Sequence, residues 1–125
     1  MDQRNVRALI ASLSTVLAIG CVVMAVAHAG VVVPLVSALG PEGDDAVWPA
    51  VILFGISAAL LTCVAVGAAR ARAWAWALGL VVHAVIVLGS ALQYRGAASL
   101  VAIVLGVLSL ALLLSRSGHA SLLPS

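Results

Sequence analysis

The chain has 125 residues, of which 65% are hydrophobic and only 8% are charged, and its formal net charge is +2. Soluble globular domains contain about 45–50% apolar and about 25% charged residues, so this composition excludes an ordinary water-soluble domain and predicts that lipid surrounds most of the chain. The small net charge gives no reason to expect nucleic acid as a partner, and the length leaves no room for a large soluble core. We therefore expect one membrane domain over residues 1–125, in contact with membrane lipids.

A first apolar run follows the short polar start of the chain, which contains Arg4 and Arg7. About 20 apolar residues cross a bilayer, so the run is long enough for a tilted helix. Pro34 disfavours a helical conformation at the residue before it. The sequence therefore predicts a first span over residues 8–33.

Two processing signals overlap this first span. Residues 27–29, Ala-His-Ala, resemble a signal-peptidase site, and residues 19–21, Ile-Gly-Cys, partly match a lipoprotein box. A lipidated chain normally becomes polar after its cysteine, whereas this one continues Val-Val-Met. We expect the first span to stay uncleaved and in the membrane.

Three more apolar segments predict spans over residues 47–69, 73–92 and 97–115. An acidic loop with Pro and Gly precedes the second span, and a short basic turn joins the second span to the third. Residues 117–125 are short and polar enough to form a flexible tail. Four spans put both termini on one side of the membrane.

Basic residues gather on one side of these spans, whereas the other side carries Arg95 and the acidic loop. The positive-inside rule places the basic side in the cytoplasm, so we expect both termini to be cytoplasmic and the protein to lie in the cell (inner or plasma) membrane. Tryptophans beside the basic turn are expected at the level of the lipid headgroups. The residues that we expect to anchor this topology are Arg4, Arg7, Arg70, Arg72, Trp74, Trp76 and Arg116.

Small residues at four-residue spacing indicate where the helices pack, because close backbone contact sorts helices in lipid, where apolar contact alone gives no net drive. The expected fold is an all-α membrane protein, an antiparallel four-helix transmembrane bundle in which the second and third spans are neighbours. The expected helix-packing positions are Gly55, Ala59, Cys63, Gly67, Ala75, Gly79, Ala102 and Gly106.

His83 lies near the middle of the third span, on the same stripe as Gly79. An ionisable side chain at this depth is a candidate proton relay, metal ligand or haem ligand. The alternative is a neutral histidine that is hydrogen-bonded to a carbonyl or to a hydroxyl such as Ser57 or Thr62. Both interpretations place His83 inside the bundle.

Two further residues are candidates for function. His28 lies in Val-Ala-His-Ala, which echoes Val-Val-His-Ala around His83 and would fit a duplicated two-helix unit. A haem held by both histidines is disfavoured, because at 1.5 Å per residue His28 lies about 30 Å and His83 about 15 Å from the basic end. Arg95 either reaches the outer headgroups or binds an anionic lipid or a partner.

The predicted spans contain no Asp or Glu, which argues against a carboxylate-driven antiporter and against a carboxylate-rich metal site. In size and span number the chain resembles a small multidrug-resistance transporter, but it lacks the glutamate in the first span on which that family depends. The sequence has no nucleotide-binding loop, no Cys-x-x-Cys motif and no nucleophile beside a base. We expect a protein that is not an enzyme, has no cofactor or metal, and keeps Cys21 and Cys63 unpaired.

The turn between the second and third spans reads Gly-Ala-Ala-Arg-Ala-Arg-Ala-Trp-Ala over residues 67–75. With four spans around it, this turn resembles that of a group of small uncharacterised integral membrane proteins of actinobacteria, which carry an Arg-x-x-Arg-Trp-Ala-like turn at this place. The resemblance covers the second to fourth spans, and Ala77 replaces the extra basic residue expected just after the turn. It implies a four-span fold and no particular activity.

Three functions remain open on these grounds. The first is a non-catalytic, oligomerising or accessory subunit of a larger membrane complex, whose partner is a second copy of the chain or another membrane protein. The second is a small transporter or a lipid- or hydrophobe-binding module with a cavity at His83, lined by Ser57, Thr62 or Ser90. The third is a haem- or quinone-associated subunit of a respiratory complex.

Overall fold

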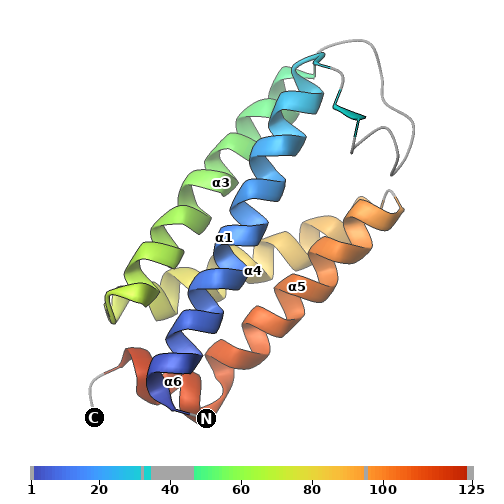
Figure 1. Cartoon of the computed structure of the whole chain (residues 1–125). Helices are drawn as coiled ribbons and strands as arrows, with labels where there is room; N and C mark the ends of the chain where they lie inside the picture. Colours follow the sequence, from blue (N-terminus) through green and yellow to red (C-terminus); the bar gives the residue numbers. More distant parts are fainter. Residues whose placement is uncertain (1, 32, 35–46, 95, 124–125) are drawn as a thin grey trace.

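The computed structural model describes residues 2–31, 33–34, 47–94 and 96–123. Within these residues the regular structure is helical and contains no strand. Four long helices and one short one follow in order, as Figure 1 shows. They are α1 (Gln3–His28), α3 (Trp48–Ala69), α4 (Trp74–Leu92), α5 (Ala97–Leu114) and α6 (Arg116–Leu122).

The four long helices are each long and apolar enough to cross a membrane. Helices α3, α4 and α5 coincide with the expected spans to within one residue at each end. Helix α1 begins and ends about one turn earlier than the expected 8–33, because Gly30, with φ of 91°, takes the chain out of the helix before Pro34 is reached. The polar residues before position 8 form the first turns of the same helix.

The C-terminal segment corrects an expectation. Residues 117–122 were expected to belong to a flexible tail, but they lie in α6. The Ser115 side chain accepts a hydrogen bond from the Gly118 backbone N–H at 2.9 Å and so caps the start of this helix. Leu122 is buried against Val6 and Ile10 of α1. Docking on α1 therefore supports a helix that would be too short to persist alone.

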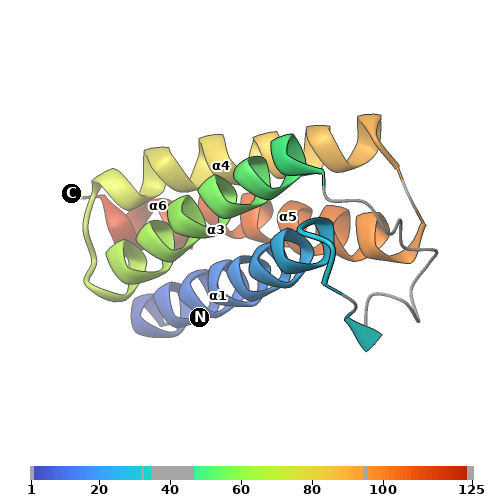
Figure 2. The same cartoon turned by 90° about the horizontal axis from the view of Figure 1, so that it is seen from above.

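The long helices form two hairpins, with the most extensive contacts between α1 and α3 and between α4 and α5. In the first hairpin the Val47 N–H donates to the His28 carbonyl at 2.8 Å at one end, and Ile10 packs with Ala68 at the other. The two helices of each hairpin run in opposite directions, and the views in Figures 1 and 2 agree on this arrangement. The short turn after Ala69 joins the two hairpins and keeps α3 beside α4.

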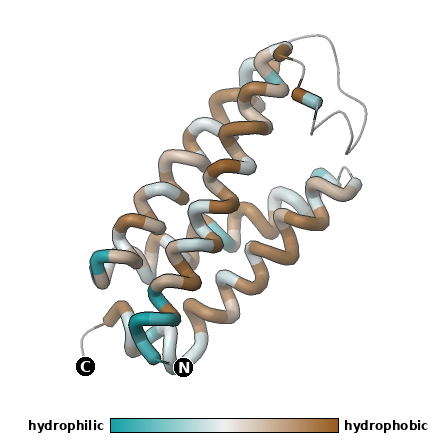
Figure 3. Tube along the Cα trace, viewed as in Figure 1, coloured by the Kyte–Doolittle hydropathy of each residue, from teal (hydrophilic) through white to brown (hydrophobic). Residues whose placement is uncertain are grey.

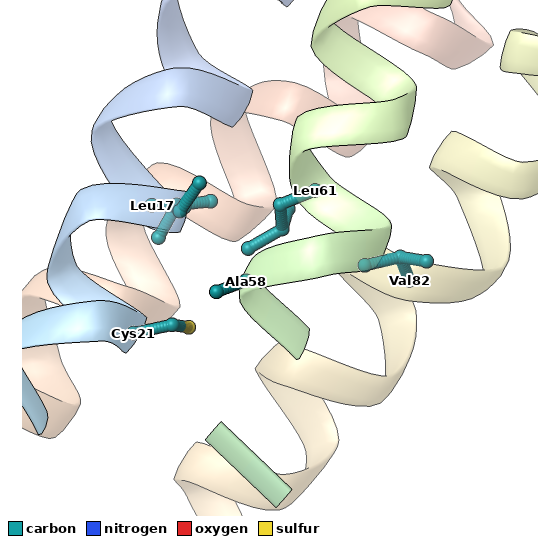
Figure 4. Close-up of a cluster of buried hydrophobic side chains, with 6 residues drawn as sticks. Leu17, Cys21, Ala58, Leu61 and Val82 are labelled. Atoms are coloured by element: carbon teal, nitrogen blue, oxygen red, sulfur yellow. The ribbon is translucent and has the colours of Figure 1, made fainter. Parts of the chain in front are cut away.

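Two apolar clusters hold the hairpins together. In the first, drawn in Figure 4, Leu17 and Cys21 of α1 face Ala58 and Leu61 of α3, and Val82 of α4 packs on the far side of α3. The second cluster lies at the end where the chain begins and contains Val6, Ile10, Ala68, Leu113 and Leu122. The first cluster lies near the middle of α1, α3 and α4. The second lies at the end where α1 starts and α3 ends, which also carries hydrophilic residues in Figure 3.

Burial therefore divides each long helix into two parts. The buried residues lie in what we call the packed half: α1 up to Cys21, α3 from Ala58, α4 up to His83 and α5 from Gly106. The remaining parts, residues 22–28, 48–57, 84–92 and 97–105, form the open half, and none of these residues is buried. The packed half also carries the α3–α4 turn and α6.

Candidate functional site

His83 is completely buried, with 0% of its surface exposed. Its Nδ1 lies 2.7 Å from the carbonyl oxygen of Gly79, one turn earlier in α4, and its Nε2 lies 3.4 Å from Oγ of Ser14 in α1. A carbonyl only accepts, so Nδ1 carries the proton and donates. In a neutral ring, Nε2 then accepts a hydrogen bond from the Ser14 hydroxyl. The imidazole thus links α4 of one hairpin to α1 of the other.

A third buried polar side chain lies at the same level of the bundle. Gly79 packs against Leu113 and Gly106 packs against Val87, and this register places Ser109 of α5 opposite His83. Ser109 is also 0% exposed, and its hydroxyl donates to the Leu105 carbonyl at 2.9 Å. The interior of the packed half therefore holds a polar layer made of Ser14, His83 and Ser109.

The polar layer contains its own hydrogen-bond partners. Each side-chain N–H or O–H in it has an acceptor. His83 and Ser109 donate to backbone carbonyls of their own helices, and Ser14 donates to the His83 ring. Such saturation lowers the cost of burying polar groups. It also leaves neither nitrogen of His83 available for a metal or another ligand unless Ser14 or the Gly79 carbonyl is displaced.

The expected hydroxyl partners of His83 are different from those found. Ser57 donates to the Leu53 carbonyl at 2.8 Å and Thr62 donates to the Ala58 carbonyl at 2.7 Å, each within α3. The alternative of a histidine bonded to a carbonyl or a hydroxyl matches the structure in kind, but Gly79 and Ser14 take the places for which Ser57 and Thr62 were named as examples. A hydroxyl in a helix readily bonds the carbonyl four residues earlier. Ser14 was missed because its relation to His83 depends on how α1 is rotated against α4.

His28 repeats the local geometry of His83 in a different setting. Its Nδ1 lies 2.7 Å from the Met24 carbonyl, again one turn earlier, and its ring centroid is 5.2 Å from that of Phe54. His28 is half-buried in the open half, at the last residue of α1, whereas His83 lies deep in the packed half. The structure thus does not bring the two histidines together. Arg95 lies outside the described residues.

Small residues of α4 and α5 lie at close helix contacts. Ala75 and Gly79 are buried, Ala102 is half-buried, and Gly106 is buried against Val87. A Cβ atom on Gly106 would come within 2.6 Å of a Val87 methyl group. These contacts allow the backbones of α4 and α5 to approach closely.

The row expected on α3 faces outward except at its last member. Gly55, Ala59 and Cys63 are exposed, and a Cβ atom on Gly55 would meet nothing within 4 Å. Gly67 is buried beneath the ring of Trp74. Helix α3 instead turns the face with Ala58, Leu61, Ala65 and Ala68 inward. Because α3 is apolar on all sides, its sequence does not select which face packs.

The end of the packed half is closed by contacts that the sequence did not indicate. Trp76, expected at the headgroups, is half-buried and donates from Nε1 to the Leu113 carbonyl at 2.8 Å. Its ring meets the His119 ring of α6 edge to face, with 5.4 Å between centroids. Arg7 donates from Nη1 to the Ser121 carbonyl at 3.4 Å. In the sequence, α6 is indicated by Ser115, a residue type that favours the start of a helix, and by the apolar residues Leu122 and Leu123 that follow.

The side chains of the other four arginines in the described part of the chain make no hydrogen bond or ion pair within it. All four are exposed at the end of the packed half, on α1, on the α3–α4 turn and on α6, namely Arg4, Arg70, Arg72 and Arg116. Trp74 is half exposed beside the same turn, with 51% of its surface free. The residues expected to anchor the topology therefore lie at one end of the molecule.

A shallow groove lies elsewhere, on the outer side of the α1–α3 hairpin. It encloses about 330 Å³ and is lined by residues that include Thr15, Ile19, Thr62 and Val66, but not His83. The Thr15 hydroxyl donates to the Ala11 carbonyl at 2.7 Å, and the Thr62 hydroxyl is likewise bonded within its own helix. The groove therefore offers an apolar surface.

Both cysteines are free thiols, Cys21 buried and Cys63 exposed. No three His, Cys, Asp or Glu side chains come together as a possible metal site in the residues that the structure describes. Comparison with protein-family models, with curated proteins and with solved structures found no match.

Proposed function

We propose that this chain is an integral membrane protein that acts non-catalytically, as an oligomerising or accessory subunit of a larger membrane complex. The observation that carries the proposal is the contrast between a closed interior and an uncovered exterior. The buried polar groups are hydrogen-bonded to one another or to their own helices. The outward face of α3, with Gly55, Ala59 and Cys63, is exposed, and a Cβ atom on Gly55 would meet nothing within 4 Å. In lipid, such a small-residue face allows another helix to approach closely.

In this proposal the four long helices form an antiparallel transmembrane bundle in the plasma membrane, with both termini in the cytoplasm. The gathering of Arg4, Arg70, Arg72 and Arg116 at one end supports this orientation through the positive-inside rule. A reporter that fluoresces only in the cytoplasm, fused after Ser125, is expected to be active. A periplasm-dependent phosphatase at the same site is expected to be inactive, and the reverse pair of results would contradict the orientation.

Native mass spectrometry of the full-length protein, released from its own membranes in nanodiscs, tests the subunit role. The expected spectrum contains a homo-oligomer or a co-purified membrane protein. A Gly55→Leu variant is expected to lose that species, because the larger side chain covers the outward face of α3. The matched control is Gly20→Leu, at a glycine of α1 that also has nothing within 4 Å of its Cβ position. A lone monomer in the unmodified protein would overturn the proposal.

The transporter or hydrophobe-binding alternative has less support. A cavity at His83 would need space beside the ring, but His83 has no exposed surface and lies outside the groove on α1 and α3. A haem ligand at His83 would have to displace Ser14 from Nε2. We therefore assign His83 a structural role in joining the two hairpins.

A further inference from the structure

The turn between α3 and α4 holds two arginines on an ordered backbone. The backbone N–H groups of Arg70, Ala71 and Arg72 donate to the last carbonyls of α3, at 3.0, 3.1 and 2.8 Å respectively. Ala71 adopts a left-handed conformation, with φ of 52°, which reverses the chain within a few residues. The turn is therefore tied to the end of α3, and the attachment points of the two guanidinium groups are held in place.

An aromatic ring lies beside these two arginines. The Trp74 ring covers Gly67, where a Cβ atom would come within 2.7 Å of Cη2, so the glycine provides the space that the ring occupies. About half of the Trp74 surface, 51%, remains exposed. An indole in this position, apolar on its faces and polar at its N–H, suits the boundary between lipid tails and headgroups.

The two guanidinium groups have no acceptor from the protein. Arg70 and Arg72 are exposed, and neither guanidinium group makes a hydrogen bond or ion pair within the described residues. Asp2 at the start of α1 carries the one Asp or Glu carboxylate within the described residues, and it is exposed and makes no ion pair with either arginine. A guanidinium group offers a fork of N–H donors that matches the oxygens of a phosphate.

We propose that the Arg70–Trp74 turn is a binding site for the headgroup phosphate of an anionic phospholipid. Two uncompensated positive charges favour an anionic lipid over a zwitterionic one, whose own ammonium group offsets its phosphate. The exposed indole favours a lipid over a free phosphate, because it can pack on the acyl region while the arginines bind the headgroup. This inference rests on the proposed membrane location, but it does not depend on the subunit role or on which side the turn faces.

The test measures lipid binding to the purified full-length protein in mild detergent. Phosphatidylglycerol, phosphatidylcholine and inorganic phosphate are titrated separately, and the bound lipid is counted by native mass spectrometry. The unmodified protein is expected to prefer phosphatidylglycerol and not to respond to inorganic phosphate at the same concentration. The R70Q/R72Q double variant is expected to lose about 25-fold in affinity for phosphatidylglycerol, because each basic residue contributes about 1 kcal/mol, or about fivefold, at an anionic surface.

The matched control is the double variant R4Q/R116Q, which removes the same charge from two other exposed arginines at this end. It is expected to keep its affinity within about threefold. Equal losses in the two double variants would overturn the assignment to the turn, as would an unmodified protein without preference for phosphatidylglycerol. Competition by inorganic phosphate would overturn the assignment to lipid.

If R70Q/R72Q does not give a helical, monodisperse protein, the single variants R70Q and R72Q replace it, each with an expected loss of about fivefold. An unchanged affinity in both single variants would overturn the proposal. The same spectra report partner proteins separately from bound lipid. Loss of lipid preference with a partner retained, or the reverse, therefore distinguishes failure of this proposal from failure of the subunit role.

Discussion

The packed and open halves of the long helices are made from the same kinds of residue but differ in contact. In the packed half, Gly67 lies against Trp74 and Ala75, and Gly79 lies against Leu113 and Val64. In the open half, Cβ atoms on Gly55 and Gly89 would meet nothing within 4 Å. Apolar composition and glycine content are therefore not sufficient to pack these helices along their whole length. The packed half has in addition close contacts at every glycine except Gly20, a buried polar layer and a docked α6.

The largest difference is expected from the same substitution made in the packed half and in the open half of α3, at Gly67 and at Gly55. In Gly67→Ala the new Cβ atom would come within 2.8 Å of the Ala75 Cβ, which is fixed to its backbone, so the start of α4 must move. We expect the free energy of unfolding to fall by about 1–3 kcal/mol, as for other overpacked sites. In Gly55→Ala we expect a gain of about 0.5–1 kcal/mol, because alanine favours a helix interior and meets no neighbour.

Equilibrium unfolding in mixed detergent micelles, followed by circular dichroism, measures both variants. Gly79→Ala provides an intermediate case, because its new Cβ atom would meet only side-chain methyl groups of Leu113 and Val64, at 3.1 and 3.3 Å, which can yield. A loss at Gly55 as large as that at Gly67 would show that α3 is packed along its whole length, which would remove the contrast between the two halves.

A smaller effect, confined to the end of the packed half, is expected from Gly118→Ala. A Cβ atom at this position would overlap the backbone carbonyl oxygen of Leu112, which no side-chain rotation can relieve. Helix α6 would have to leave its place on α5, so we expect trypsin to cleave after Arg116 about tenfold faster, equivalent to about 1.4 kcal/mol. The control Ala120→Ser changes an exposed residue of α6 and is expected to alter the rate by less than about threefold. Equal cleavage of Gly118→Ala and the unmodified protein would contradict the docked position of α6.

Much of the fold could be predicted from the sequence, because the length of the hydrocarbon layer and the position of charges limit where a span can lie. Helices α3, α4 and α5 show this, since their bounds differ from the expected ones by at most one residue at each end. The inward face of α3 could not be predicted, because every side of the helix is apolar. Helix α6 could not be predicted either, because its stability depends on contacts with Val6 and Ile10, which are more than 100 residues away in the sequence.

The candidate site was predictable only in part for the same reason. The sequence indicated a histidine inside the bundle, because His83 lies on the same stripe as the packing residue Gly79. The kinds of partner, a carbonyl and a hydroxyl, could be predicted, but the hydroxyl itself could not. The examples Ser57 and Thr62 share α3, a helix adjacent to α4 in sequence, whereas Ser14 lies 69 residues away on α1. A hydrogen bond between helices depends on their relative rotation and depth, and these are set by packing rather than by any local pattern.

The smallest effect is expected from a comparison of the two histidines. Each ring donates to the carbonyl four residues earlier in its own helix, but only the His83 ring also has a partner in another helix, Ser14. His83→Leu is expected to lower the free energy of unfolding by about 1 kcal/mol. A double-mutant cycle that combines His83→Leu with Ser14→Ala is expected to give a coupling energy of about 0.6 kcal/mol and at most about 1.7 kcal/mol. This is the range for hydrogen bonds between helices in membranes. For His28→Leu, the cycle with Ser14→Ala is expected to give a coupling energy within about 0.3 kcal/mol of zero, because the His28 ring donates to the Met24 carbonyl of its own helix and not to Ser14. Equal coupling energies for the two histidines would mean that the contact between His83 and Ser14 does not hold the hairpins together. The stability of the packed half would then depend on its apolar and glycine contacts alone.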